Sequence, residues 1–260
     1  MHTKTFDVFE KKFPYLRFVI HIFKLIEYYI LKNFVDITTF SGQYAIKLYQ
    51  KRYNLKKNKL IYLPLNFIFK DSLKKHHYLK KEKKKIILSI GRLAHVKRPF
   101  ETISIFKKVI SKDKFIKKNF KLYLIGTGDL FNSVQKFIKK NQLNKHIVLL
   151  KQFDSKIMPQ VYKCGHSLIC LSSSETGPTV VKEALFSGIP VFSTNVGQVK
   201  KIITKNNGKI IPVNNTSLNV NEYIKFLKKK FNKKKIKKNF KLFLTKEEKT
   251  LEKTLNKIYR

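Results

Sequence analysis

Two glutamates, Glu175 and Glu183, stand eight positions apart in a segment that reads as a strand, a turn and a helix. Acidic residues are scarce in this chain, which has 16 Asp and Glu against 57 Lys and Arg. A carboxylate can accept hydrogen bonds from two neighbouring hydroxyls, so the pair suits the vicinal diols of a ribose or a hexose. The structural alternative leaves Glu183 facing solvent and makes Glu175 the cap of the helix.

The residues between the two glutamates predict the beginning of that helix. Pro178 suits the first helical turn, and Gly177 allows the backbone to approach a ligand closely. Free amide groups at residues 179 to 181, which include Thr179 and Val180, favour an anion such as a diphosphate.

A second segment, Gly91 to Lys97, follows the first predicted strand of the α/β region. Gly91 permits a tight turn. Arg92 and Lys97 can converge on a pyrophosphate, and a planar guanidinium matches phosphate oxygens. Arg92 is the more informative of the two, because the chain has only five arginines. Surface salt bridges are the alternative for both side chains.

Gly126 and Gly128 form a Gly-x-Gly pair after the next predicted strand. The pair indicates another tight turn on the phosphate or sugar side of a ligand, and a purely structural turn explains it equally well. The full Gly-x-Gly-x-x-Gly pattern is absent, which argues against an enzyme that uses a nicotinamide or flavin.

Spacings typical of metal ligands are also missing. His76, His77 and His95 are expected to be solvated loop residues, and Cys164 and Cys170 do not form a Cys-x-x-Cys pair. We therefore expect no metal, no bound cofactor and no disulfide framework.

The formal net charge of +41 would suit a nucleic acid or an anionic membrane as partner. The low arginine content, together with abundant Phe, Ile, Asn and Tyr, favours instead the composition of an AT-rich genome. A basic polyanion-binding protein stays an alternative, although Arg-rich or aromatic-interleaved recognition segments are absent.

Short apolar runs alternate with helical stretches from Lys85 onward. Strands that are apolar on both faces and separated by helices predict a Rossmann-like α/β domain, with a parallel sheet covered on both sides. Ligands of such sheets bind at the carboxyl ends of the strands, where all the motifs above fall. The expected strands are residues 86–90, 121–125, 146–150, 167–171, 189–193 and 209–213, and the expected helices are residues 100–111, 130–141, 156–164, 178–187 and 197–204.

The ends of the chain read differently from this domain, which spans residues 86–218. Residues 1–73 predict part of another domain, and residues 74–85 a charged linker. Residues 219–260 predict lysine-rich helices. In the first part we expect a helix near residues 10–33, a strand near 36–40, a helix near 43–53 and a link through 63–66.

The most apolar stretch carries Arg17, His21, Lys24 and Glu27 at helical spacing. We expect a helix packed inside a domain rather than a membrane span, with a helix lying on a membrane surface as the alternative. No signal peptide is apparent among the first residues.

Three motifs in this order and spacing resemble glycosyltransferase family 4 of the GT-B enzymes: Gly91-Arg92 with Lys97, Gly126-x-Gly128, and Glu175-x7-Glu183-Ala followed by Ser-Gly-Ile-Pro-Val. The resemblance covers about residues 60–212. It implies a complete C-terminal Rossmann-like domain and a partial N-terminal, acceptor-side domain, because a complete one needs several more βα units. The last helix resembles the family's C-terminal helix, which returns to the N-terminal domain.

The resemblance implies an enzyme that transfers a sugar, with retention and without a metal, from a nucleotide diphosphate sugar to an acceptor hydroxyl in polysaccharide or glycolipid biosynthesis. Arg92 and Lys97, with the amides of Thr179 and Val180, would neutralise the leaving diphosphate. His2, with Thr3, resembles the family's catalytic-site histidine near the N-terminal edge of the cleft.

Glu175 would be the catalytic carboxylate that holds the donor sugar near the reacting carbon, beside Gly177 and Pro178. Glu183 would bind the ribose. The expected partners are the nucleotide sugar and a glycan or lipid-linked acceptor, with no nucleic acid. The expected location is the cytoplasm, with peripheral contact at the inner face of an anionic membrane.

Some positions depart from the family pattern. Thr176 stands where the family usually has Gly, Gln198 and Lys201 replace a Gly and a Glu, and Lys151 replaces a common Gly. These departures leave the donor sugar open. The short N-terminal part leaves a second hypothesis open as well, namely a catalytically incomplete donor-binding remnant or subunit that needs a separate N-terminal chain.

Overall fold

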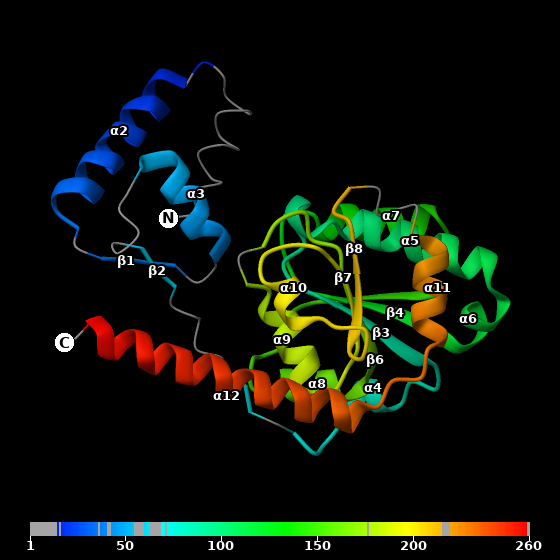
Figure 1. Cartoon of the computed structure of the whole chain (residues 1–260). Coiled ribbons are helices and arrows are strands. Elements are labelled where there is room, and N and C mark those ends of the chain that lie inside the picture. The colour runs from blue at the N-terminus through cyan, green and yellow to red at the C-terminus, as the bar shows by residue number, and fades with distance from the viewer. Residues whose placement is uncertain are drawn as a thin grey trace. The chain divides into compact units, whose positions relative to one another are not determined.

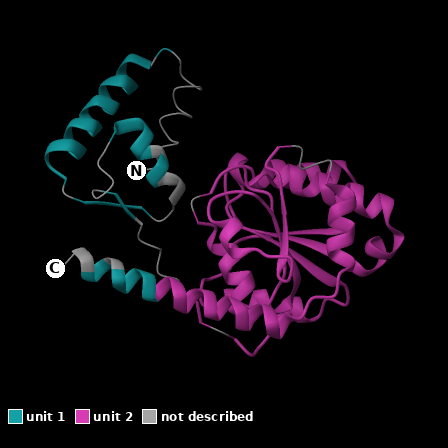
Figure 2. Cartoon of the chain, in the orientation of Figure 1, with its two compact units in different colours: residues 1–65, 249–260 teal, residues 66–248 magenta. Residues whose placement is uncertain are grey.

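The computed structural model describes residues 15, 17–35, 37–40, 43–54, 60–62, 69–70, 72–175, 177–214 and 219–258. The chain divides into two compact units (Figure 2). Residues 66–248 form the larger unit, and residues 1–65 with 249–260 form the smaller one. The described residues of each unit contain a hydrophobic core of their own.

A parallel sheet runs through the larger unit, with strand order β5-β4-β3-β6-β7-β8 (Figure 1). Every neighbouring pair in this sheet is parallel. Each strand matches an expected one to within two residues at either end. The strands are β3 (Lys85–Ile90), β4 (Phe120–Ile125), β5 (Ile147–Leu150), β6 (Gly165–Cys170), β7 (Val191–Thr194) and β8 (Gly208–Ile211).

Successive strand residues point to opposite sides of the sheet, so apolar strands make both of its faces apolar. Helices cover both faces. In β3, Ile87 contributes to one apolar core while Ile86 and Leu88 contribute to the other. The first core includes residues of α5 (Pro99–Lys112), α6 (Lys114–Asn119), α7 (Phe131–Lys140) and α11 (Val220–Lys228). The second includes residues of α4 (His77–Lys80), α8 (Met158–Cys164), α9 (Thr179–Phe186), α10 (Val199–Ile202) and the start of α12 (Lys233–Ile258). The Rossmann-like α/β prediction is confirmed.

The order of the strands reverses between β3 and β6, which makes the carboxyl ends of these two strands a topological switch point. The chain winds outward from β3 through β4 and β5, and β6 then pairs with the other side of β3. Loops that leave β3 and β6 therefore diverge to opposite sides, which is where ligands of open α/β sheets bind. The two glutamates follow β6, and the Gly91 turn follows β3.

Local capping accounts for one helix that the sequence analysis missed. Asp113 ends α5, and its Oδ1 accepts a hydrogen bond from the amide of Ile116 at 3.0 Å, which starts α6. Within residues 74–85, α4 buries Leu79. His76, expected to be solvated, is buried as well and contacts the ring of Phe153.

The smaller unit contains a helix α2 (Arg17–Asn33), a strand β1 (Thr38–Phe40), a helix α3 (Gln43–Tyr53) and a strand β2 (Leu60–Tyr62). β1 and β2 pair in parallel, and Tyr49, Tyr53 and Leu60 form a small core. The sequence analysis did not predict β2. The expected link through residues 63–66 lies outside the described residues.

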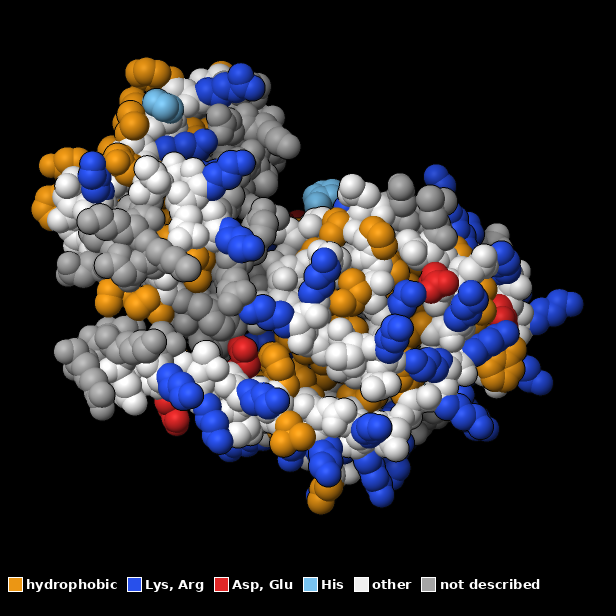
Figure 3. Space-filling view, in the orientation of Figure 1, with side chains coloured by type: hydrophobic (Ala, Val, Ile, Leu, Met, Phe, Trp, Pro, Cys, Tyr) orange, Lys and Arg blue, Asp and Glu red, His pale blue; other side chains and the backbone are white. Residues whose placement is uncertain are grey.

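α2 turns its single acidic side chain inward and leaves apolar side chains in solvent. The hydroxyls of Tyr49 and Tyr53 donate to the two carboxylate oxygens of Glu27. Exposed apolar side chains lie along the rest of the helix, as the orange atoms at the α2 edge of Figure 3 show. They are Phe18, Val19, Ile22, Phe23, Leu25, Ile26, Tyr29 and Ile30. We expected this apolar surface to pack inside a domain, but in the described residues it is exposed. None of the described helices is both long and apolar enough to cross a membrane.

Candidate functional site

The turns after β3 and β4 interlock through their backbones. The amide of Gly91 donates to the carbonyl of Ile125 at 3.0 Å, and the amide of Leu93 donates to the carbonyl of Thr127 at 2.8 Å. A Cβ on Gly126 would lie 2.0 Å from the carbonyl oxygen of Gly91, and the φ of Gly126 is 156°. Glycine is therefore required here by packing of one turn on the other.

Gly128 has the same kind of role. A Cβ there would lie 2.6 Å from the carbonyl oxygen of Leu93. The structural alternative thus explains both glycines of the Gly-x-Gly pair. A ligand contact by Gly91, Gly126 or Gly128 stays a prediction.

The guanidinium of Arg92 stands free at the tip of the first turn. Its side chain is exposed and has no hydrogen-bond or ion-pair partner among the described residues. The salt-bridge alternative for Arg92 therefore finds no support. Arg98, to which the sequence analysis assigned no role, has a φ of 52° and donates to the carbonyl of Val213 at 2.6 Å, so it fastens the start of α5.

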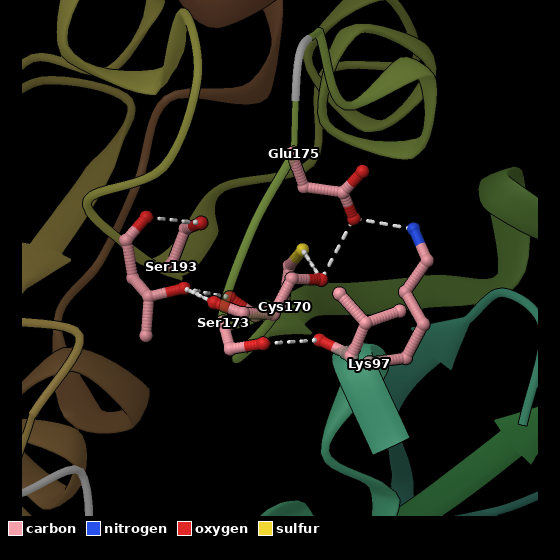
Figure 4. Close-up of polar contacts among 8 residues, drawn as sticks. Lys97, Cys170, Ser173, Glu175 and Ser193 are labelled. Atoms are coloured by element: carbon pink, nitrogen blue, oxygen red, sulfur yellow. Dashed lines mark hydrogen bonds and ion pairs between the residues drawn. The ribbon is translucent and has the colours of Figure 1, made fainter. Parts of the chain in front are cut away.

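Lys97 and Glu175 form an ion pair between the segment after β3 and the loop after β6. Figure 4 shows the two side chains pointing toward each other. Ser172, which is buried, donates from Oγ to the same Glu175 oxygen at 2.8 Å. The side chains of Lys97 and Glu175 are only 27% and 15% exposed, so this pair is less screened by solvent than a surface salt bridge.

Three further hydrogen bonds hold the loop that carries Glu175. The amide and hydroxyl of Ser173 donate to the carbonyl of Val96 at 2.8 and 3.3 Å. The hydroxyl of Thr194, at the end of β7, donates to the carbonyl of Ser172 at 2.6 Å (Figure 4). The loop is thus fixed from both neighbouring strands, which preorganises the position of Glu175.

The start of α9 presents free amides, as the sequence predicts, although fewer of them. The amides of Thr179 and Val180 have no acceptor among the described residues, while the amide of Val181 donates to the carbonyl of Pro178 at 3.1 Å. No side chain caps the helix at Pro178, so the helix-cap alternative for Glu175 is not met. A Cβ on Gly177 would meet nothing within 4 Å, which leaves open space beside these amides.

Glu183 is half-buried rather than turned to solvent. Its Oε2 accepts a hydrogen bond of 2.7 Å from the hydroxyl of Tyr162, a fully buried residue of α8. Burial raises the pKa of Glu183, and the hydrogen bond from Tyr162 opposes that rise. Tyr162 carries no motif of its own, so the sequence analysis did not find it.

The model of the family described as glycosyl transferases group 1 matches residues 71–243. The chain belongs to this family. The match covers the Gly91 turn, the start of α9 and both glutamates.

Relatives in this glycosyltransferase family are much longer than this chain. N-acetyl-alpha-D-glucosaminyl L-malate synthase of Bacillus anthracis is 26% identical over 182 residues, which is 67% of this chain and 46% of that protein. The chain thus spans about half the length of the curated relatives that it matches.

Solved structures with the GT-B fold superpose on the same elements. The structure of TarM has a TM-score of 0.70 at 20% identity, covering 88% of this chain and 45% of TarM. The pneumococcal O-GlcNAc transferase GtfA, solved with UDP and GlcNAc, has a TM-score of 0.66 at 20% identity, covering 87% of this chain and 47% of GtfA. These similarities confirm the predicted GT-B fold.

A small hollow opens beneath the first turn of this glycosyltransferase fold. It has a volume of about 20 Å³, enough for roughly one water, and lies among Gly91, Arg92, Lys97, Cys170 and Ser172. A nucleotide is therefore too large to fit inside this hollow.

Other predicted residues lie outside this cluster. His2, Thr176 and the segment 63–66 fall outside the described residues. Among the residues that the structure describes, no group of three or more His, Cys, Asp or Glu side chains could hold a metal ion. Ser172 was also missed as a site residue, although its position two residues after β6, within a run of serines, was a usable signal.

Proposed function

We propose that this chain binds a nucleotide diphosphate sugar over the carboxyl ends of β3 and β6. We also propose that the chain takes part in the transfer of this sugar, with retention, to an acceptor hydroxyl in polysaccharide or glycolipid biosynthesis. The donor-binding domain would span residues 86–218, with residues 1–73 on the acceptor side, 74–85 as linker and 219–260 as C-terminal helices.

One observation carries this proposal: a guanidinium and two amides that have no partner among the described residues lie with two carboxylates at the carboxyl ends of β3 and β6. Arg92 and the amides of Thr179 and Val180 suit the charge of a diphosphate. Glu175 and Glu183 suit hydroxyls on either side of it. An elongated ligand that combines a diphosphate with two sugars, which is a nucleotide sugar, satisfies all of these groups together.

The proposed chemistry needs positive charge where the leaving diphosphate develops its negative charge. Arg92 and Lys97 would supply it, assisted by the free amides at the start of α9. Glu175 would hold the donor sugar beside this charge, near Gly177 and Pro178, and Glu183 would hold the ribose. No metal is part of the proposal, because fixed cations and amides would stabilise the leaving group. His2 would serve the acceptor side.

Titration calorimetry with UDP-sugars and GDP-sugars tests the donor site. We expect the wild-type chain to bind at least one of them, and Arg92→Ala and Glu183→Ala to weaken that binding about tenfold or more. Lys108→Ala, which removes an exposed lysine of α5, is the matched control. A wild-type chain that binds no nucleotide sugar would overturn the proposal.

We propose that the chain binds its acceptor, a glycan or a lipid-linked acceptor, at the cytoplasmic surface of a membrane. The exposed apolar side chains of α2 support a peripheral contact, because Arg17 and Lys32 of the same helix are exposed and its only carboxylate is turned inward. Nucleic acid is not among the proposed partners.

A second candidate function is a donor-binding subunit that acts with a separate N-terminal chain. The same exposed surface of α2 favours it, together with the length of the relatives, of which this chain spans about half. Sugar transfer by the chain alone, measured with a UDP-sugar that it binds, would exclude this candidate.

A further inference from the structure

Tyr162 is a buried tyrosine whose hydroxyl is committed to one carboxylate. It lies on α8, and its OH donates to Oε2 of Glu183 on α9 at 2.7 Å. The Tyr162 hydroxyl oxygen also lies 3.4 Å from the carbonyl oxygen of Val180, a longer contact than that to Glu183. The ring of Phe69 meets the tyrosine ring edge-on, with centroids 5.7 Å apart. A fully buried ring held in this way has little freedom to turn.

This contact leaves Glu183 with one occupied oxygen and one open oxygen. No partner contacts Oε1 of Glu183 among the residues that the structure describes. A glutamate on a helix surface samples several rotamers, and fixing it in one of them costs conformational entropy. When a buried donor holds one oxygen, that entropy is lost on folding rather than on ligand binding, which favours affinity.

We propose that Tyr162 is a positioning residue that orients the Glu183 carboxylate toward the ribose hydroxyls of the donor nucleotide. The inference rests on the proposed function and adds to it a residue outside the recognised motifs. It also names what this part of the site selects, namely a ribonucleotide over an analogue without ribose hydroxyls. A site built to hydrogen-bond a hydroxyl discriminates strongly against a ligand that lacks it.

Electrostatics supports the same assignment. Burial raises the pKa of Glu183, so the charged form needs a donor to stay populated, and Tyr162 is that donor. Burial also raises the pKa of the Cys170 thiol on β6, which opposes a negative charge there. Lys182, the neighbour of Glu183 on α9, interacts with Glu247 of α12. Loss of the Tyr162 hydroxyl should therefore make Glu183 easier to protonate.

The test compares UDP with 2′,3′-dideoxy-UDP, which has the same charge and lacks both ribose hydroxyls. The matched variants are Tyr162→Phe and Tyr123→Phe. Tyr123 is another buried tyrosine, and its hydroxyl donates to Glu82 at 2.9 Å. Titration calorimetry gives both affinities for each protein, and circular dichroism checks the fold of each variant.

In the wild type we expect UDP to bind about tenfold more tightly than the dideoxy analogue. In Tyr162→Phe the affinity for UDP should fall about tenfold while that for the analogue stays the same, so the preference disappears. Tyr123→Phe should keep the wild-type preference. The pH at which UDP binding is lost on acidification should rise in Tyr162→Phe alone.

Equal losses for UDP and the analogue, or an unchanged preference and pH profile, would overturn the inference while leaving the donor site intact. GDP and its dideoxy analogue replace the uridine pair if UDP does not bind. A wild type that binds neither nucleotide overturns the donor site itself. If Tyr162→Phe does not fold, a fluorinated tyrosine at position 162 keeps the ring and makes the hydroxyl more acidic. In that variant, UDP binding should be lost at a lower pH than in the wild type. Loss of UDP binding at the same pH as in the wild type would count against the inference.

Discussion

Lys97 and Glu175 form an ion pair, although the motifs place Lys97 on the diphosphate side and Glu175 on the sugar side of the proposed donor. Their ion pair joins the segments after β3 and β6, and Ser172 donates to the same carboxylate. A diphosphate would offer Lys97 a second anionic partner. Donor binding would therefore compete with this pair for Lys97 and release Glu175 toward the sugar.

This competition predicts an unusual response to Glu175→Gln. Because Lys97 loses its carboxylate partner, we expect UDP to bind roughly threefold more tightly, while UDP-glucose gains nothing because its sugar contact is weakened. The affinity for UDP-glucose relative to that for UDP, measured by titration calorimetry, should therefore fall. Glu82→Gln removes a similar partner from Lys121 elsewhere and is the control. Weaker UDP binding in Glu175→Gln would contradict the competition.

Arg92→Ala should weaken UDP binding about tenfold and reduce its dependence on salt. The guanidinium has no partner among the described residues, so its removal should leave the free energy of unfolding within about 0.5 kcal/mol of the wild type. Calorimetry at two salt concentrations and urea unfolding measure the two effects. Binding that is as strong as in the wild type would remove Arg92 from the donor site.

Two glycines of the site should respond to alanine in opposite ways. Gly126→Ala forces a Cβ to within 2.0 Å of the Gly91 carbonyl at a φ of 156°, so we expect a loss of about 3 kcal/mol in the free energy of unfolding. Gly177→Ala meets open space and should change it by less than about 0.5 kcal/mol. Urea unfolding of both variants gives the comparison. Similar values for the two would contradict the interlocked turns.

His166 predicts a pH dependence of stability. Burial and the nearby Lys85 and Lys233 lower its pKa to about 4, below the value of roughly 6.5 expected in the unfolded chain. Between these pH values the unfolded state binds more protons, so the free energy of unfolding should fall as the pH drops from about 6.5 to 4.

Substitution of His166 checks this origin. His166→Gln should flatten the decline measured by urea unfolding at several pH values. It should not abolish the decline, because burial lowers the pKa of His76 and His146 too. The exposed His95, replaced by Gln, serves as the control. An unchanged slope in His166→Gln would rule out its contribution.

The exposed surface of α2 predicts binding to vesicles that contain an anionic phospholipid. Phe18→Glu together with Phe23→Glu should abolish co-sedimentation, because both side chains are exposed and the new charges oppose insertion. Phe115→Glu changes an exposed phenylalanine of α6 and should keep it. If vesicle binding persists in the double variant, the surface of α2 does not bind the membrane, and a protein partner becomes the alternative for it.

Much of the larger unit follows from local patterns. Apolar runs such as residues 86–90 are buried on both faces, and turn residues separate them from helices. The six strands and the helices α5, α7, α8, α9 and α10 could therefore be predicted to within about two residues, whereas the short helices α4 and α6 were missed. The places of Arg92, Glu175 and Glu183 after a strand or within a helix could be predicted for the same reason, while their roles in binding stay a prediction.

The smaller unit shows where local patterns fail. Spacing places polar and apolar residues on α2, yet it does not say which of them face a neighbour. Glu27 is turned inward because Tyr49 and Tyr53 of α3 donate to it, and this depends on how α3 packs. The apolar residues of α2 are left in solvent as a consequence.

By itself, the sequence determined the α/β fold, the family and the edge of the sheet where the motifs gather, because these depend on periodicity and on short segments. Only the tertiary structure decided the partners of the two glutamates. Lys97 reaches Glu175 over 78 positions, and Tyr162 reaches Glu183 over 21. Such contacts depend on which strands are neighbours and which helices share a face, and no local pattern encodes the distance between two side chains.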